Sequence, residues 1–395
     1  MKWNNKGHEF DSELEKLSSI FNKPIYIWGA GINGKNLNHI IGHFTEITAY
    51  IDNDDAKQKQ KIDEKNVISF ADYCTLNDKG IIIVATSKLN APSVMNQLMK
   101  AGFKRNRDFF SLDEFENHVL PIEALYHWNQ SYMVLAQIVL TERCTLRCAK
   151  CAHACYAIPQ TDEDSSMDYV KKSADSFFGK VDFIREFVLI GGEPLLYKKL
   201  PEAIEYVGKH YRNQMDIFSI TTNGTIIPDE KVLEMCARYK VLVRISNYSK
   251  AIPRMTNQYE RLCTFLHDHG VEYDLQRGDG NWIDYGFDYV CDLYDTKLLT
   301  NKFDLCKTQC REIRENKLYY CVMARSVSDN LGLNEGKDDF LDLDSLNDNN
   351  YKKILLEFNL GYSDKGYLDM CRRCHGMDAV HYPIPVAEQC QYSLL

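Results

Sequence analysis

The chain has 395 residues, of which 45% are hydrophobic and 26% are charged, and its net charge is −9. One hydrophobic core rarely grows to this size, so two or three domains are expected. The acidic balance argues against binding to nucleic acid or to an anionic membrane surface, and no apolar run is long enough to span a bilayer.

The first part of the chain alternates predicted strands with predicted helices. It opens with a polar segment, residues 1–13, that lacks the features of a secretory signal, so we expect a cytoplasmic protein. Apolar runs predict strands and amphipathic patterns predict helices. The strands fall at 25–28, 47–51, 67–70 and 81–85, and the helices at about 32–43 and 91–101. This alternation predicts a small Rossmann-like parallel sheet, a domain that we place at residues 1–118.

A glycine-rich loop follows the first predicted strand of this domain. Gly29, Gly31 and Gly34 open a helix, and Asp52 ends the next strand about 20 residues on, as in the dinucleotide-binding fingerprint. Such glycines let a pyrophosphate approach the helix N-terminus, and the aspartate would accept a hydrogen bond from a ribose hydroxyl. A lone fingerprint is also compatible with a domain used only for docking. Binding of a nucleotide or nucleotide-sugar and a docking role therefore both stay open, and hydride transfer from NAD is not favoured.

A second series of strands and helices begins near Met133. Its predicted strands are 134–140, 187–190, 217–221 and 241–245, and its clearest helices are 200–210 and 229–239. Repeated βα units with polar residues directly after the strands predict a barrel or partial barrel. The region after residue 300 is rich in cysteine and contains a polar stretch, 328–350, that is typical of a loop.

The chain has 14 cysteines, a high number for a chain expected in a reducing compartment, and ten of them fall in two groups. Only Cys74 precedes residue 144, four cysteines lie between 144 and 155, and six lie beyond residue 305. Clustered cysteines in such a protein indicate metal or redox chemistry. Two groups therefore predict two metal sites.

The first group places Cys144, Cys148 and Cys151 on one short loop after a strand. Three thiolates on a four-iron cube leave one iron open to a small molecule, which distinguishes a reactive site from a closed structural one. The alternative is a structural zinc site that recruits His153 or Cys155 as the fourth ligand.

The spacing of these three cysteines resembles that of the radical S-adenosylmethionine (SAM) superfamily, and three motifs at later strand ends strengthen the resemblance. They comprise Gly191, Gly192, Glu193 and Pro194, then Thr222 and Asn223, and then Arg244 and Ser246. In the family these segments contact the amino group, ribose or carboxylate of SAM. The resemblance covers about residues 130–300 and implies a partial (β/α)6 barrel over 119–300. One departure is Lys150, because the residue before the third cysteine is often aromatic in the family.

The resemblance implies a [4Fe–4S] cluster on the three cysteines, with SAM bound to it. An electron donor such as flavodoxin or ferredoxin would reduce the cluster. SAM would then split into methionine and a 5′-deoxyadenosyl radical that abstracts hydrogen from an unactivated carbon.

The second cysteine group resembles the auxiliary-cluster domain of the SPASM/twitch subfamily. The resemblance implies that Cys306, Cys321, Cys371 and Cys374 hold a second, auxiliary [4Fe–4S] cluster in a twitch-type domain at 301–395. Asn316 stands where the family usually has glycine, a mild change because both residues tolerate a left-handed turn. Cys310 in place of Cys306, and a zinc ion in place of the cluster, stay open as alternatives.

These features lead to three hypotheses about function. The first is a radical SAM oxidoreductase or isomerase that oxidises or epimerises a carbohydrate or nucleotide-linked sugar, with the sugar inferred by analogy from the N-terminal domain. The second is a radical SAM maturase that modifies a peptide. The third is a zinc-stabilised binding protein without enzymatic activity.

Overall fold

The structure is a computed structural model that describes residues 22–161, 164–278, 280–287, 293–306, 308–333, 336–347, 349–361 and 363–390. The described residues divide into two compact units, and the division falls between Tyr132 and Met133. Among these residues, no helix is both long and apolar enough to cross a membrane.

The N-terminal unit is built on one six-stranded sheet in the order β3-β4-β2-β1-β5-β6. Its strands are β1 (Ile25–Trp28), β2 (Ala49–Ile51), β3 (Lys61–Ile62), β4 (Lys65–Ile68), β5 (Ile81–Val84) and β6 (Phe109–Ser111). All pairs are parallel except β3 with β4. Every residue of β1 and β5 is buried, as expected for central strands that are covered on both faces. The predicted parallel sheet is therefore present in this unit.

The helical segments of this unit continue past the predicted domain boundary at residue 118. They are α2 (Ile32–Gly42), α3 (Phe70–Thr75), α4 (Ala91–Lys100), α5 (Leu112–Glu114), the π-helical turn Phe115–Val119 and α6 (Leu120–Trp128). At the end of α6, the Trp128 ring lies 5.3 Å from the ring of Phe44. Aromatic packing thus joins α6 to the sheet unit, which extends to residue 132.

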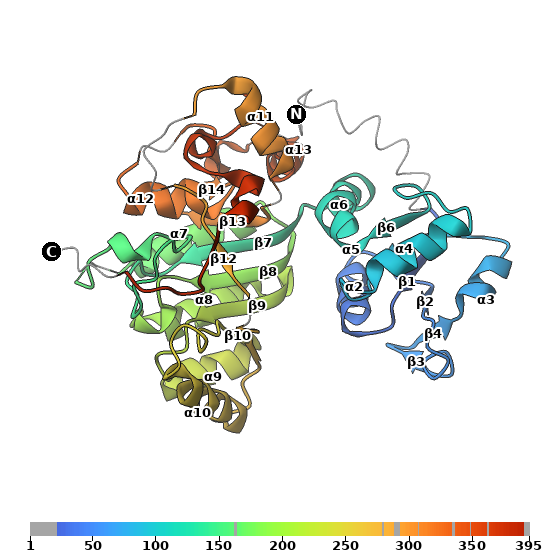
Figure 1. The fold of residues 1–395 in the computed structure, drawn as a ribbon, viewed down its shortest axis with the longest axis horizontal. Helices are drawn as coiled ribbons and strands as arrows, with labels where there is room; N and C mark the ends of the chain where they lie inside the picture. Colours follow the sequence, from blue (N-terminus) through green and yellow to red (C-terminus); the bar gives the residue numbers. More distant parts are fainter. Residues whose placement is uncertain are drawn as a thin grey trace. The chain divides into compact units, whose positions relative to one another are not determined.

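The second unit contains an eight-stranded sheet in the order β11-β10-β9-β8-β7-β13-β14-β15. Its strands are β7 (Tyr132–Val139), β8 (Phe183–Ile190), β9 (Met215–Thr222), β10 (Val241–Ile245), β11 (Tyr273–Leu275), β13 (Cys310–Arg314), β14 (Lys317–Tyr319) and β15 (Phe340–Asp342). The main helices are α7 (Met167–Phe178), α8 (Leu200–Tyr211), α9 (Glu230–Tyr239), α10 (Met255–Asp268), α11 (Thr296–Leu305), α12 (Ser328–Asn330) and α13 (Tyr351–Asn359). Figure 1 shows β7 to β10 side by side with helices connecting them.

This sheet differs from the predicted arrangement at its C-terminal side. Strands β7 to β11 follow one another in βα order, and β13 then pairs in parallel with β7, on the side of β7 away from β8. Strands β14 and β15 add antiparallel pairs beyond it. Strands β13 to β15 of the predicted C-terminal domain are therefore part of the same sheet as β7 to β11, and the polar stretch 328–350 includes a strand because Phe340 and Leu341 pair with β14.

The two faces of the sheet differ in polarity. Ala136 and Ile138 of β7 and Ile313 of β13 belong to the main hydrophobic core, together with side chains of α7 to α10. Intervening residues point to the other face, where Gln137 Nε2 donates a hydrogen bond to Glu312 Oε2 at 3.0 Å. We call this side of the sheet the polar face. Alternation along the strands places Gln137, Glu186, Ser219, Arg244, Cys310 and Glu312 on it.

Candidate radical SAM and auxiliary cluster sites

The cysteine loop and the Gly-Gly-Glu-Pro segment run together beyond the ends of β7 and β8. The backbone N–H groups of Gly192 and Glu193 donate to the carbonyls of Thr141 and Arg143, each at 2.8 Å. A Cβ atom on Gly192 would lie 2.2 Å from the Arg143 oxygen, and one on Gly191 would lie 2.5 Å from the Thr141 oxygen. The two glycines are thus required for the close approach of the two segments. Pro194 begins the short 3₁₀ turn Pro194–Leu196 that follows them.

Cys144, Cys148 and Cys151 lie in one apolar cluster with Leu146 and Ala387. N–H donors point at two of the sulfurs: the Leu146 backbone and the Asn223 amide each lie 3.5 Å from Cys144 Sγ, and the Gln389 amide lies 3.3 Å from Cys148 Sγ.

Burial raises the pKa of both Cys144 and Cys148 to about 12, so as unligated thiols they would be protonated at neutral pH. Coordination to a metal removes that proton. A hydrogen bond from the Cys155 thiol lowers the pKa of Cys151.

This arrangement fits a [4Fe–4S] cluster held by three thiolates. Iron–sulfur clusters are stabilised by N–H donors to their cysteine sulfurs and by an apolar surround, and both are present. In the described residues, no three Cys, His, Asp or Glu side chains lie close enough together to hold a single metal ion. A four-iron cube takes its thiolates from farther apart than one zinc ion, whose sulfur ligands lie about 2.3 Å from the metal.

Glu193 joins the ends of β8 and β9. Its buried carboxylate accepts hydrogen bonds from Thr222 Oγ1 at 2.8 Å, the Asn223 backbone at 2.8 Å and the Leu195 backbone at 3.1 Å. Burial raises the pKa of Glu193 to about 7 although these donors lower it. The glutamate therefore orders the two loops that the family uses for SAM.

The end of β10 is attached to the same region. The Ser246 backbone donates to the Thr222 carbonyl at 2.9 Å, and the Tyr259 hydroxyl donates to the Ser246 carbonyl at 3.0 Å. Tyr248 and Trp282 pack in an edge-to-face pair, with ring centroids 5.7 Å apart, against the cysteine cluster. Two aromatic side chains therefore pack against the cysteine cluster, although position 150 itself is a lysine.

Arg244 is engaged on the polar face. Its guanidinium donates two hydrogen bonds to Glu186, at 2.6 and 2.9 Å, and one to Asp274 at 3.0 Å. Ser219 Oγ donates to the same Glu186 carboxylate at 2.7 Å. These contacts place Arg244 in a charged group on the polar face of the sheet.

Lys150 has a left-handed backbone, with φ of 58°, and its ammonium lies 3.2 Å from Asp284 Oδ2. Both side chains are largely buried. Asp284 immediately precedes Tyr285, which lines the cavity described next. Lys150 therefore links the cysteine loop to that second site.

The four predicted auxiliary ligands line one cavity of about 270 Å³. These ligands are Cys306, Cys321, Cys371 and Cys374. The rest of the lining is mainly apolar and includes Phe303, Met323 and Met370. Lys302 Nζ donates to the carbonyls of Cys371 and Cys374, at 3.1 and 2.6 Å. Burial raises the pKa of Cys371 to about 12 and that of Cys374 to about 11.

An enclosed set of four thiols fits a fully ligated cluster. Cys310, the alternative ligand, does not line this cavity: its Sγ donates to Gln137 Oε1 at 3.2 Å on the polar face.

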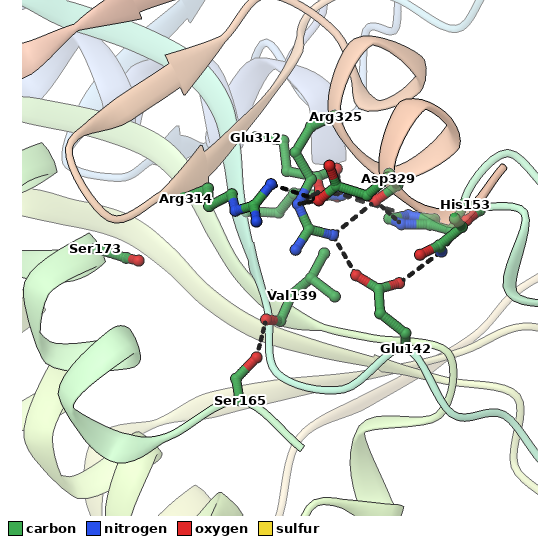
Figure 2. Close-up of polar contacts among 12 residues, drawn as sticks. Val139, Glu142, His153, Ser165, Ser173, Glu312, Arg314, Arg325 and Asp329 are labelled. Atoms are coloured by element: carbon green, nitrogen blue, oxygen red, sulfur yellow. Dashed lines mark hydrogen bonds and ion pairs between the residues drawn. The ribbon is translucent and has the colours of Figure 1, made fainter. Parts of the chain in front are cut away.

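A buried polar network, which the sequence analysis missed, joins the cysteine loop to the turn after Cys321 (Figure 2). Arg325 forms ion pairs with Glu142, with Glu312 at 3.3 Å and with Asp329 at 3.6 Å. His153 Nδ1 lies 3.0 Å from Ser326 Oγ. Burial lowers the pKa of His153. Burial also acts to lower the pKa of Arg325, but the neighbouring carboxylates outweigh it and hold that pKa well above its usual range. Arg325 is thus a buried charge that connects the cysteine loop to the segment after Cys321.

Replacement of Arg325 by Met should destabilise the apoprotein by about 3–5 kcal/mol, because Glu142 and Glu312 would lose their buried counter-charge. Urea unfolding measures the effect. The matched control is Arg238→Met, which removes an exposed i,i+4 pair with Glu234 and should cost at most about 1 kcal/mol. Equal losses in the two variants would contradict the role assigned to Arg325.

The glycine loop of the N-terminal unit lies at the C-terminal ends of β1 and β5, the strands between which the sheet order reverses. Gly29 has φ of 120°, and a Cβ atom on Gly34 would lie 1.8 Å from the Gly29 oxygen. No side chain caps α2, which begins after Gly31. The predicted ribose acceptor, Asp52, instead accepts from the Ala30 N–H and from Lys57 Nζ, both at 2.9 Å. Burial acts to raise the pKa of Asp52, but these hydrogen bonds hold that pKa below its usual value.

Residues 138–249 match the family profile described as Radical SAM superfamily. That superfamily implies a [4Fe–4S] cluster and SAM.

Two curated proteins are similar over part of the chain. The GTP 3′,8-cyclase of Syntrophomonas wolfei subsp. wolfei is 34% identical over 103 residues, or 25% of this chain and 28% of the cyclase. The antilisterial bacteriocin subtilosin biosynthesis protein AlbA of Bacillus subtilis is 26% identical over 152 residues, or 38% of this chain and 29% of AlbA. The chain thus spans less than a third of the length of either relative.

Three solved structures give partial superpositions. The peptide-bound and AdoMet-bound anSMEcpe superposes with a TM-score of 0.39 and 16% identity, covering 62% of this chain and 85% of that one. BtrN in complex with AdoMet and 2-DOIA gives 0.40 and 14%, covering 66% and 98%. Streptococcus suis SuiB bound to its precursor peptide SuiA gives 0.36 and 14%, covering 79% and 89%.

Proposed function

We propose that the protein is a radical SAM enzyme that uses two [4Fe–4S] clusters to oxidise a polar substrate, a carbohydrate or nucleotide-linked sugar. The observation that carries this proposal is the single cavity lined by Cys306, Cys321, Cys371 and Cys374, in a chain that also has a radical SAM domain. A closed four-thiolate site suits electron transfer, and a site with three thiolates suits SAM.

Cys144, Cys148 and Cys151 would hold the first cluster. When bound, this cluster and SAM supply the one-electron chemistry that generates a hydrogen-abstracting radical. Glu193 would fix the loop at Thr222 and Asn223 in the position from which it contacts SAM. Ser246 at the end of β10 would contact SAM as well, and Tyr248 and Trp282 would provide the apolar surface for adenine in place of an aromatic residue at position 150.

The polar face supports a hydroxylated substrate. It carries the Glu186–Arg244 pair, Ser219, Gln137 and Glu312, which supply hydrogen-bond donors and acceptors of the kind that suit hydroxyl groups. In the N-terminal unit, Gly29, Gly31, Gly34 and Asp52 would bind a nucleotide. The buried Thr86 hydroxyl beside Gly29 has no hydrogen-bond partner within the described part of the chain, which suits a ligand at this loop.

Oxidation is favoured over epimerisation because the auxiliary site offers an acceptor for the second electron. Epimerisation would instead need a thiol that returns hydrogen to the substrate radical, and Cys310 is the thiol on the polar face. A flavodoxin or ferredoxin would supply the reducing electron.

A peptide substrate is the second candidate, favoured by the partial similarity to AlbA. A deuterium-transfer experiment separates the two classes. Labelled sugars and nucleotide-sugars, and a labelled candidate peptide, are incubated with the reduced enzyme and SAM, and deuterium is measured in 5′-deoxyadenosine. Transfer from a sugar supports the first proposal, whereas transfer only from a peptide overturns it.

Anaerobic purification tests the whole assignment. We expect a brown protein with about eight irons per chain, as two four-iron clusters require. Stoichiometric zinc without iron would support a zinc-stabilised binding protein and end the radical SAM proposal.

A further inference from the structure

The segment Val386–Cys390 lies against the loop that carries the three SAM-cluster cysteines, more than 230 residues earlier in the chain. We call it the closing segment. Cys148 and Gln389 form an antiparallel bridge, the Ala149 N–H donates to the Glu388 carbonyl at 2.6 Å, and the Cys390 N–H donates to the Arg147 carbonyl at 2.7 Å. The closing segment therefore acts as a short additional strand on the cysteine loop.

Two further contacts hold the closing segment in place. Upstream, the strand Pro383–Ile384 pairs antiparallel with Trp282–Ile283, and Trp282 itself packs against the cysteine cluster. Ala387 has a left-handed backbone with φ of 52°, and its side chain is only 1% exposed in the same apolar cluster as Cys144 and Cys148. An alanine rarely adopts this conformation, so burial of its methyl group among the cysteines must compensate the strain.

The side-chain amide of Gln389 can be oriented in only one way. Its Oε1 faces the Arg147 N–H at 2.9 Å, which can only donate, and its Nε2 faces the Ala387 carbonyl at 2.7 Å, which can only accept. The second Nε2 hydrogen is then directed at Cys148 Sγ, 3.3 Å away. Both ends of the amide are thus fixed by backbone groups.

We propose that Gln389 is a positioning residue that donates a hydrogen bond to the Cys148 ligand and thereby raises the reduction potential of the SAM cluster. This inference rests on the proposed function. One-electron reduction, with the electron taken from a low-potential carrier, adds one negative charge to the cluster and its thiolates. A donor to a ligand sulfur stabilises the more negative state, and such hydrogen bonds are among the determinants of cluster potential.

The test is a redox titration of the full-length, anaerobically loaded Gln389→Met protein, in which the side chain keeps its length but loses the donor. The EPR signal that changes on adding SAM identifies the cluster. We expect the ratio of reduced to oxidised cluster at a fixed solution potential to fall about threefold to tenfold, where tenfold corresponds to about 59 mV for a one-electron couple. Iron content and thermal unfolding temperature should match those of the wild type.

Gln60→Met is the matched control, because it makes the same replacement at an exposed glutamine of the N-terminal unit. Gln389→Glu is the second variant: it keeps an oxygen for the Arg147 N–H, removes the donor and adds a negative charge, so its potential should become more negative than that of Gln389→Met. An unchanged potential in an iron-loaded Gln389 variant would overturn the inference. Loss of iron from both Gln389→Met and Gln389→Glu would also overturn it, because it would show a purely structural role. A wild type without any SAM-responsive cluster would instead overturn the proposed function.

Discussion

Replacing Cys148 by Ala is expected to reduce SAM cleavage to background. Cys148 is one of three thiols that would hold the SAM cluster, and it is buried in the apolar cluster that also contains Cys144 and Cys151. Two remaining thiolates would not retain a four-iron cube with one open iron. Chromatography of the 5′-deoxyadenosine formed by dithionite-reduced protein measures the loss of SAM cleavage. The iron content should fall by about four per chain.

Cys263→Ala is the matched control for this experiment. Cys263 lies on α10, packs against the main hydrophobic core and belongs to neither set of candidate cluster ligands. Its replacement should leave iron content and SAM cleavage unchanged. If Cys148→Ala still produced 5′-deoxyadenosine at the wild-type rate, the assignment of the SAM site would fail.

Replacing Cys371 by Ala is expected to separate SAM cleavage from substrate oxidation. Cys371 lines the auxiliary cavity, and its loss should remove about four of about eight irons while the SAM cluster remains. The substrate radical would then lack its electron acceptor, so 5′-deoxyadenosine should still form while the oxidised product is lost. Iron analysis and parallel measurement of 5′-deoxyadenosine and product give the result.

Cys310→Ala is the control that also tests the alternative ligand. The Cys310 thiol contacts Gln137 on the polar face, so its replacement should leave the iron content at the wild-type value. Loss of about four irons from Cys310→Ala, with full retention in Cys306→Ala, would reverse the assignment of the fourth auxiliary ligand.

Much of the fold could be predicted because it depends on local patterns. The uninterrupted apolar runs at 25–28 and 81–84 identified the central strands of the N-terminal sheet, and both lie fully buried there. The domain boundary could not be predicted, because it depends on the contact of Trp128 with Phe44, which is distant in sequence. The place of β13 beside β7 is likewise a long-range pairing that periodicity does not reveal.

The candidate sites show the same division. The resemblance to the radical SAM and SPASM/twitch families proposed the candidate ligands, and the four auxiliary candidates line one cavity. The Arg325 network and the contact of Gln389 with Cys148 were missed, because single polar residues far apart in the sequence carry no spacing signal. Lys150 departed from the family pattern, and its ion pair with Asp284 explains a lysine at this position without an aromatic contact.

The pairing of β7 with β13 also bears on electron transfer. Cys310 is in register with Leu135 near the start of β7, and the auxiliary cysteines 306 and 321 flank this end of the β13–β14 hairpin. Cys144 follows the opposite end of β7, beyond Val139. A strand rises about 3.3 Å per residue, and its hydrogen-bonded neighbours prevent it from stretching. We therefore expect the β7–β13 pair to contribute to the separation of the two proposed redox centres, so that an insertion within β7 would change the rate of electron transfer between them even if every cysteine ligand were kept.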